Sequence, residues 1–271
     1  MPRIRTNTLT MHYEQQGAGA PLLLIPYTAA DHACYAFQVA EYAKHFSCIS
    51  LDLRGTGETE KPEVAYTTEV LADDVAAFMQ AMGIRKAHIA GLSLGAAIGL
   101  WVAAKYPDTV ASLSLHSAWA KTDRFQQTIV ESWQVLARAV GVQDMIVRGI
   151  FPWCFTPELY ASRPEYIDSL AAFVRSRPAQ TVTDFIRQSN AVIMHDVEAQ
   201  LGRITAPTLI TFGRHDMVTS VRFLDPLKNG IRDSEILLFE GCAHAPLYEH
   251  VEEFNEKTLA FLLRRAGAPV V

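Results

Sequence analysis

Few features of the sequence suggest a secreted, membrane-bound or nucleic-acid-binding protein. The chain has 271 residues and only four cysteines, which lie far apart and form no C-x-x-C pair. This pattern favours reduced, buried or half-buried thiols over disulfides. The N-terminal residues lack the apolar segment of a signal peptide, and no run approaches the roughly 20 apolar residues of a membrane span. We therefore expect a cytoplasmic protein.

Clusters of like charge and groups with metal-ligand spacing are also missing. Lys plus Arg number 24 and Asp plus Glu number 29, so the formal net charge is -5, with no long run of either sign. This balance argues against a nucleic-acid or anionic-membrane partner. His, Cys and carboxylate residues show no ligand spacing, so we expect no metal and no other cofactor. The 49% of hydrophobic residues can fill the core of one enzyme-sized domain.

Apolar strand-like runs alternate with helical patterns along most of the chain. The loosely alternating residues 3–15 predict an edge hairpin, because alternation is typical of a strand with one solvated face. Strands are predicted at 21–25, 48–53, 87–90, 110–115, 208–212 and 235–239, and helices at 35–46, 67–82, 94–106 and 248–265. This order predicts an α/β fold with a doubly wound, mostly parallel sheet and helices on both faces.

Residues 119–203 interrupt this alternation. They contain no convincing strand, but helical patterns near 125–149, 164–176 and 181–194 and many aromatic side chains. A segment of this length is too long for a loop in a compact domain, so we expect an inserted helical cap. The chain would then consist of a first core part (1–118), the cap (119–203) and a second core part (204–271).

The most informative motif is Gly91-Leu92-Ser93-Leu94-Gly95, between a predicted strand and a predicted helix. A serine on such a sharp turn has strained backbone angles, and its hydroxyl stands clear of the sheet. Side chains at positions 91 and 95 would obstruct the close approach of strand and helix. The motif alone is weak, but in this context it predicts that Ser93 is a nucleophile, with the Leu94 N–H aimed at an oxyanion.

A serine nucleophile needs a base and a group that orients the base. His244 follows the predicted strand 235–239, and Asp216 follows the predicted strand 208–212. Taken singly, His244 could be a surface loop residue and Asp216 a helix cap. Both nevertheless follow strands, and the carboxyl ends of parallel strands share one edge of the sheet, where ligands bind. The order Ser, Asp, His therefore favours a catalytic triad.

Four segments together resemble the α/β-hydrolase family: Gly91-Leu-Ser-Leu-Gly-Ala-Ala-Ile-Gly99, Asp52-Leu-Arg-Gly-Thr-Gly57, Pro207 to Asp216, and Gly241-Cys-Ala-His244. Within this family the chain looks most similar to small cap-bearing bacterial esterases and lactonases, such as 3-oxoadipate enol-lactonases. The resemblance implies that Ser93 is the nucleophile, His244 the general base and acid, and Asp216 its orienting carboxylate. It also implies that the Leu94 N–H is one half of the oxyanion hole.

One segment departs from the family pattern. After the first parallel strand the family usually has His-Gly-x, and the N–H of x completes the oxyanion hole. Here Pro26-Tyr27-Thr28 follows Ile25, so by position Thr28 would supply that N–H. Losing one such donor typically costs on the order of 3 kcal/mol, and we expect the donor to be kept. Tyr27 could crowd the pocket, offer its phenol to the substrate, or simply pack under the cap.

The remaining polar candidates have weaker roles. Asp31 and His32 could face the pocket, but we expect them to be solvent-exposed loop residues. Arg54 is expected to be structural and not substrate-binding. His116 and His195, near the two junctions of the cap, are expected to be hinge or core residues.

The sequence as a whole predicts a serine hydrolase that cleaves an ester or lactone of a small, fairly apolar molecule through an acyl-enzyme. Tyr27, Trp119 and Trp153 are the predicted substrate-binding residues. The open alternatives on the same fold are C–C bond hydrolysis of a ring-cleavage product, cofactor-free peroxidase or perhydrolase activity, and a ligand receptor with slow turnover. A homodimer is a further open alternative for the assembly.

Overall fold

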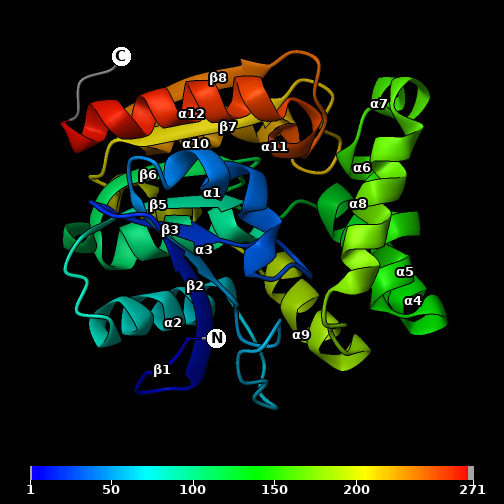
Figure 1. Ribbon diagram of the computed structural model, residues 1–271, viewed down its shortest axis with the longest axis horizontal. Coiled ribbons are helices and arrows are strands. Elements are labelled where there is room, and N and C mark those ends of the chain that lie inside the picture. The colour runs from blue at the N-terminus through cyan, green and yellow to red at the C-terminus, as the bar shows by residue number, and fades with distance from the viewer. Residues whose placement is uncertain (1, 268–271) are drawn as a thin grey trace.

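An eight-stranded sheet forms the centre of the computed structural model, which describes residues 2–267 (Figure 1). The strands are β1 (Arg3–Arg5), β2 (Thr10–Gln16), β3 (Pro21–Ile25), β4 (Ser47–Leu51), β5 (Ala87–Leu92), β6 (Val110–His116), β7 (Thr208–Gly213) and β8 (Ser234–Phe239). Their order is β1-β2-β4-β3-β5-β6-β7-β8. Only β2 pairs antiparallel with its neighbours, β1 and β4; the other pairs are parallel. The predicted mostly parallel α/β fold is confirmed.

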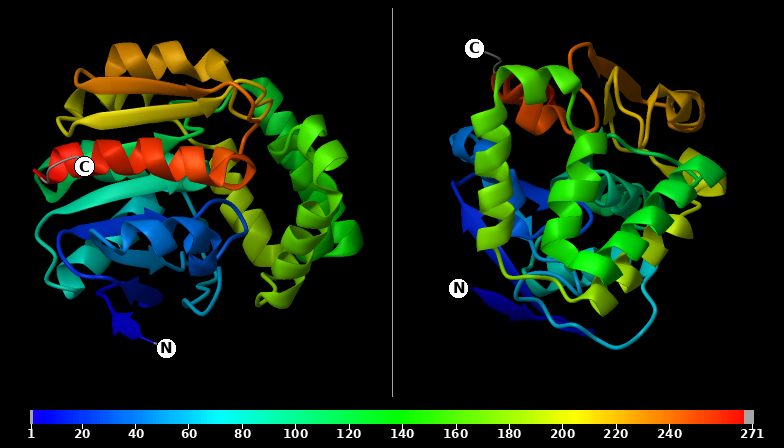
Figure 2. Two further views of the ribbon diagram at one scale, coloured as in Figure 1. Left: turned by 45° about the horizontal axis from the view of Figure 1, so that its top comes forward. Right: turned by 90° about the vertical axis from the view of Figure 1, so that its right-hand side faces the viewer.

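The central strands are apolar along their length because helices cover both faces of the sheet. In β3, residues 22–25 are fully buried, and Leu23 lies between Ile49 of β4 and Ile89 of β5. Helices α1 (Ala36–Tyr42) and α12 (Val251–Ala266) lie on one face, and α2 (Thr68–Ala81), α3 (Leu94–Lys105) and α10 (Leu224–Gly230) lie on the other (Figures 1 and 2). The sheet is thus the middle of three layers.

A group of helices lies between β6 and β7 in the chain, beside the ends toward which the parallel strands run (Figure 2). They are α4 (Arg124–Val140), α5 (Val142–Met145), α6 (Phe151–Cys154), α7 (Pro157–Ser162), α8 (Pro164–Ser176) and α9 (Val182–Ile193). We call residues 119–203, which contain them, the insert. Its two junctions meet where Lys121 bridges to Asp196, with an ion pair of 2.7 Å.

The longest helix of the insert shows why its sequence folds there. In α4, Ile129, Trp133 and Ala137 recur at four-residue spacing and are buried, so one face of the helix is apolar. Asp123 caps the N-terminus by accepting a hydrogen bond of 2.7 Å from the Gln126 N–H.

Two further sequence predictions can be compared with the described residues. All four cysteines are buried and free, as expected. Within residues 2–267, no helix is both long and apolar enough to cross a bilayer.

Candidate active site

Ser93 sits at the sharp turn between β5 and α3. Its backbone φ is +54°, a left-handed conformation that is uncommon for a residue other than glycine. Such a conformation costs on the order of 1 kcal/mol or more, and the surrounding structure must hold it in place. The Ser93 N–H donates a 2.9 Å hydrogen bond to the carbonyl of His116 at the end of β6. The strained turn predicted from the sequence is confirmed.

The two glycines of the motif are required by close backbone contacts. A Cβ atom on Gly91 would overlap the carbonyl group of Gly95, and one on Gly95 would overlap the carbonyl oxygen of Ile25. The start of α3 therefore lies directly against the end of β3. This contact brings the Ser93 turn next to residues 26–31, which we call the oxyanion loop.

Asp216 and His244 form a buried pair beyond the ends of β7 and β8. The Nδ1 atom of His244 lies 2.9 Å from Oδ2 of Asp216, and both residues are less than 5% exposed. Burial alone would raise the pKa of Asp216, but the adjacent His244 and the hydrogen bonds from Thr219 lower the pKa overall. Asp216 is therefore a carboxylate that can hold His244 with its proton on Nδ1.

Two hydroxyl residues that the sequence analysis did not single out support this pair. The Thr219 hydroxyl lies 3.0 Å from Oδ2 of Asp216 and 3.2 Å from Nδ1 of His244. The Ser117 hydroxyl donates a 2.9 Å hydrogen bond to the His244 carbonyl. Thr219 lies three residues after Asp216 and Ser117 directly follows β6, but neither position carries a motif. Their roles follow from the packing of three strand ends.

Ser93 and His244 line the same pocket. Within the described residues, no hydrogen bond joins the Ser93 hydroxyl to the His244 ring. Such bonds are commonly long in a free enzyme and tighten when substrate binds. The shared pocket and the Asp216–His244 pair are compatible with the triad, which stays a prediction.

The two predicted oxyanion donors are backbone N–H groups without a partner in the described part of the chain. Leu94 is the first residue of α3, so its N–H has no acceptor within the helix. Thr28 lines the pocket. The Tyr35 hydroxyl joins the two segments at their base, because it donates to the Ile25 carbonyl and accepts from the Leu92 N–H, both at 2.9 Å.

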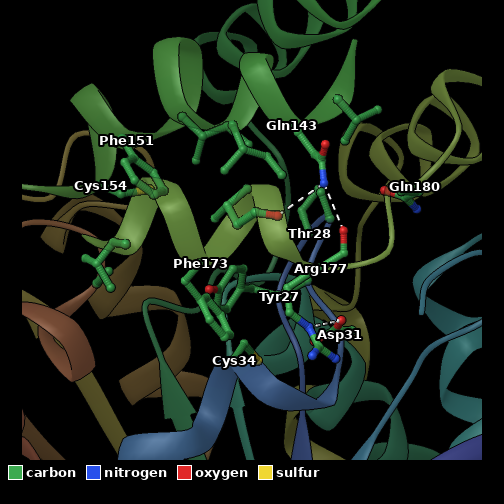
Figure 3. Close-up of a pocket in the computed structure, with 18 of the residues that line it drawn as sticks. Tyr27, Thr28, Asp31, Cys34, Gln143, Phe151, Cys154, Phe173, Arg177 and Gln180 are labelled. Carbon is green, nitrogen blue, oxygen red and sulfur yellow. Dashed lines mark hydrogen bonds and ion pairs between the residues drawn. The ribbon is translucent and has the colours of Figure 1, made fainter. Parts of the chain in front are cut away.

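Tyr27 lines the pocket (Figure 3). Its hydroxyl is already engaged. It lies 2.9 Å from the Tyr248 hydroxyl, which in turn donates a 2.6 Å hydrogen bond to the Cys34 carbonyl. The Tyr27 hydroxyl therefore acts as the donor to Tyr248. Burial raises the pKa of both phenols, so both stay neutral. Of the three sequence alternatives, the engaged hydroxyl argues against a phenol offered to the substrate and leaves the other two open.

The prediction that Trp119 and Trp153 bind substrate needs correction. Neither is among the residues that line this pocket. Trp119 is fully buried in the main core, where its indole N–H donates a 2.8 Å hydrogen bond to Thr122 and its ring packs edge-on against His195. Trp153 packs against the same core from the insert. Both rings pack the insert against the main hydrophobic core.

The pocket has an apolar wall and a polar rim. Among the described residues, the pocket has a cavity volume of about 110 Å³, which suits a small ligand. The apolar wall comes mainly from the insert and includes Trp133, Ile146, Ile150, Phe151, Phe155 and Leu170. At the rim, Nε of Arg177 lies 2.8 Å from Oδ2 of Asp31 (Figure 3). Each charge of this pair compensates the other.

Asp31, at the end of the oxyanion loop, and the adjacent His32 are more buried than the sequence suggested. Asp31 and His32 are 8% and 7% exposed, so the expectation of solvent-exposed residues was wrong. Asp31 is covered because Arg177 of the insert pairs with it, and His32 because it packs on Asp52. Arg54 is structural, as expected, and forms a two-pronged ion pair with Asp74.

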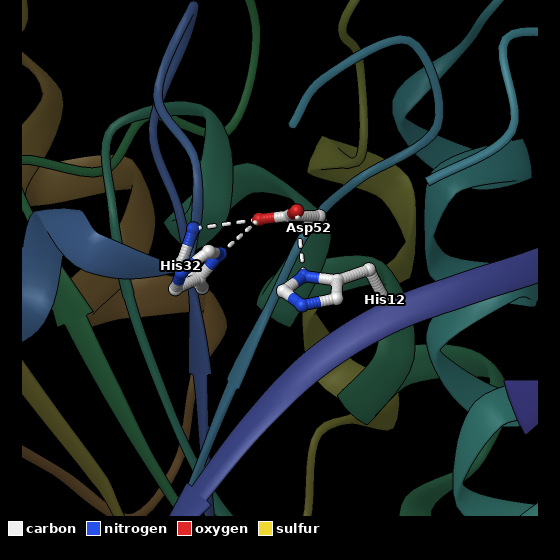
Figure 4. Close-up of side chains that lie close together, drawn as sticks. All are labelled: His12, His32 and Asp52. Carbon is white, nitrogen blue, oxygen red and sulfur yellow. Dashed lines mark hydrogen bonds and ion pairs between the residues drawn. The ribbon is translucent and has the colours of Figure 1, made fainter. Parts of the chain in front are cut away.

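His32, Asp52 and His12 form a buried trio that no sequence spacing indicated (Figure 4). Nδ1 of His12 and Nδ1 of His32 each lie 2.8 Å from an oxygen of Asp52. Asp52 also accepts hydrogen bonds from the backbone N–H groups of His32 and Glu58. The ligand-type atoms are close enough together to hold a metal ion. Both Nδ1 atoms are already bonded to Asp52, whereas Nε2 of His12 is buried and has no hydrogen-bond partner among the described residues. Hydrogen bonds to Asp52 account for the orientation of the two Nδ1 atoms.

His116 and His195 are core residues, as expected. His116 lies 2.8 Å from the Thr211 hydroxyl, and burial lowers its pKa to about 3. His195 lies 2.8 Å from the Thr68 hydroxyl, and burial lowers its pKa to about 4. Both rings are therefore neutral at pH 7.

Comparison with known proteins identifies the family. A model of the alpha/beta hydrolase fold family matches residues 21–251. RutD of Agrobacterium fabrum (strain C58), a protein named as a carbamate hydrolase, is 30% identical, and the match covers 93% of this chain and 98% of that protein. The 3-oxoadipate enol-lactonase 2 of Acinetobacter baylyi (strain ATCC 33305) is 27% identical, with 84% of this chain and 82% of that protein covered.

A thermophilic esterase from Thermogutta terrifontis shares the fold, with a TM-score of 0.86, 23% identity, and 98% of each chain covered. The match to the family spans the strand-turn-helix motif and both strand ends that carry Asp216 and His244. The chain belongs to the α/β-hydrolase family.

Proposed function

We propose that this α/β-hydrolase is a serine hydrolase that cleaves an ester or lactone of a small, fairly apolar substrate through an acyl-enzyme. The observation that carries the proposal is the buried Asp216–His244 pair on the pocket that Ser93 also lines. A nucleophile on a strained turn, a base in one tautomer and free N–H donors are the parts that acyl transfer requires.

Each part has one role in the reaction. The Ser93 oxygen attacks the substrate carbonyl carbon while Nε2 of His244 takes the hydroxyl proton, and the carbonyl electrons move onto oxygen. The N–H groups of Leu94 and Thr28 stabilise that oxyanion. Collapse of the intermediate expels the alcohol, which receives the proton from His244. Water, activated by the same histidine, then releases the acid and restores Ser93.

The charges around the pocket favour a neutral substrate. Asp31, Arg177 and His244 are the carboxylate, guanidinium and imidazole side chains among the residues that line it. Arg177 is paired with Asp31, and His244 with Asp216, so no lining cation is left to bind an anionic group. The apolar wall supplied by the insert would bind the acyl or alcohol part.

Carbamate hydrolysis is a second candidate, favoured by the RutD protein at 30% identity. A carbamate presents the same carbonyl to Ser93, and its leaving group would be protonated by His244 in the same way. The two candidates differ in the substrate and share the catalytic residues.

A substrate panel with one serine variant tests the proposal. Purified protein would be assayed on small neutral esters, lactones, carbamates and a ring-cleavage product. Ser93→Ala should abolish hydrolysis, and Ser114→Ala is the matched control, because the buried Ser114 hydroxyl has no hydrogen-bond partner among the described residues. Sustained turnover of p-nitrophenyl acetate after any burst would distinguish an enzyme from a slow receptor. Full activity of Ser93→Ala on the best substrate would refute the proposal.

A further inference from the structure

Gln188, in helix α9 of the insert, contacts the oxyanion loop from outside the pocket. We propose that Gln188 is a positioning residue, which holds the loop so that the Thr28 N–H points at the oxyanion. This inference rests on the proposed function, since it assigns a role within the same reaction. It adds a link between the insert and the catalytic chemistry.

The contact is a single, well-defined hydrogen bond. Oε1 of Gln188 accepts a 2.8 Å hydrogen bond from the Ala29 N–H, although the two residues are 159 positions apart. A backbone N–H can only donate, so the amide oxygen, and not the nitrogen, must face the loop. Gln188 is fully buried, and its Nε2 has no hydrogen-bond partner within residues 2–267. The bond from Ala29 thus satisfies the oxygen of this buried amide.

The partner of Gln188 has an unfavourable backbone conformation. Ala29 has φ +62°, in the left-handed region that alanine rarely occupies. Inside the loop, the Ala30 N–H reaches the Tyr27 carbonyl only at 3.2 Å. The hydrogen bond that the Ala29 N–H donates to Gln188 stabilises the peptide between Thr28 and Ala29 in its observed orientation.

That peptide directly follows the predicted oxyanion donor. If Ala29 relaxed to a common backbone conformation, the peptide between Thr28 and Ala29 would rotate, and the adjacent Thr28 N–H would move with it. Displacing a catalytic group by about 1 Å can cost on the order of 100-fold in rate. Losing the Gln188 contact should therefore weaken transition-state stabilisation more than substrate binding.

Two substitutions remove this contact in different ways. Gln188→Met keeps the length of the side chain but has no acceptor, and Gln188→Asn keeps the carbonyl on a side chain that is one methylene shorter. Gln134→Met is the matched control, because Gln134 also bonds to α9, through Ser189 at 2.9 Å and Asn190 at 2.8 Å, and not to the oxyanion loop. Ser93→Ala is included to test the proposed function separately.

Each variant would be measured for kcat, KM, melting temperature and affinity for a trifluoromethyl ketone. Ser93 adds to this ketone, its proton passes to His244, and the ketone oxygen becomes an oxyanion. We expect Gln188→Met and Gln188→Asn to lower kcat by about 10-fold to 100-fold. The ketone affinity should fall by a similar factor, KM should change less than about twofold, and Gln134→Met should match the wild type.

One folded Gln188 variant is enough to test whether Gln188 positions the oxyanion loop. Wild-type kcat, or a lower melting temperature with a raised KM and unchanged kcat, would overturn the positioning role and leave a purely structural contact. If Ser93→Ala retained activity, the proposed function itself would fail. If Ser93→Ala were inactive while the Gln188 variants behaved as wild type, only the present inference would fail.

Discussion

The Asp216–His244 pair, which we call the acid–base corner, and the oxyanion loop lie at one pocket, but different parts of the chain support them. Asp216 and His244 are held by Ser117 and Thr219, which follow strands β6 and β7 of the core. The oxyanion loop is held by Gln188 and Arg177 of the insert. The core is a closely hydrogen-bonded sheet, whereas the insert contacts the loop through a few long side chains. Under the proposed mechanism, changes in the insert would alter oxyanion stabilisation and leave the Asp216–His244 pair intact.

The largest effect is expected on the core side of this comparison, from Asp216→Asn. Asparagine cannot hold His244 in the tautomer that accepts the Ser93 proton, so kcat should fall by about 10⁴-fold. Steady-state kinetics on the best ester would measure the loss, with circular dichroism to verify folding. Asp196→Asn, at the exposed base of the insert, is the control and should keep wild-type kcat. A kcat within tenfold of the wild type for Asp216→Asn would contradict the assignment of the acid–base corner.

An intermediate effect is expected where the insert meets the core, at His195. Burial lowers its pKa to about 4, whereas a histidine in the unfolded chain titrates near 6.5. The unfolded state therefore binds the proton more readily, and stability from this source is complete above pH 6.5 and falls as the pH drops toward 4. His195 alone should contribute a loss of about 3 kcal/mol in the free energy of unfolding.

Urea denaturation at pH 7 and pH 4.5 would measure this loss in the wild type and in His195→Gln, whose side chain does not titrate. The variant should lose clearly less stability between the two pH values. His116, with a pKa lowered to about 3, adds to the loss in both proteins, and Glu249, with a pKa raised by burial, acts in the opposite sense. These contributions cancel in the comparison. Equal losses in the two proteins would show that His195 is not the titrating group.

The smallest effect is expected where the insert contacts the oxyanion loop, from Asp31→Asn, which removes the partner of Arg177. This substitution keeps an oxygen for the Ala33 N–H but removes the charge that pairs with Arg177. The freed guanidinium should raise kcat/KM for an ester that carries a carboxylate, relative to its neutral analogue, by about threefold to tenfold, because the site is partly solvated.

The ratio of kcat/KM for the charged and the neutral ester, measured at low and high salt, tests this expectation. High salt should reduce the gain. Asp144→Asn frees Arg175 in a comparable exposed pair outside the pocket and should leave the ratio unchanged. A ratio that stays at the wild-type value in Asp31→Asn would show that the ion pair does not set the charge preference of the pocket.

The sequence predicted those features that depend on neighbours along the chain. The apolar run of β3, the glycines on both sides of Ser93 and the positions of Asp216 and His244 after strands all carry local patterns. The errors and omissions involve contacts between distant segments. Asp31 is buried by Arg177, 146 residues away, and Ala29 is held by Gln188, 159 residues away. Trp119 looked like a pocket residue, but the packing of the insert junction placed it in the core.

By itself, then, the sequence determined the mostly parallel sheet, the strained turn at Ser93 and the edge of the sheet at which Asp216 and His244 lie. Strand periodicity and glycine requirements act over a few residues, so they can be read from the chain. Only the tertiary structure decided that Ser117 and Thr219 support the Asp216–His244 pair, that the Tyr27 hydroxyl is engaged, and that the insert contacts the oxyanion loop. Those features depend on which side chains meet when separate segments pack, and no local pattern specifies them.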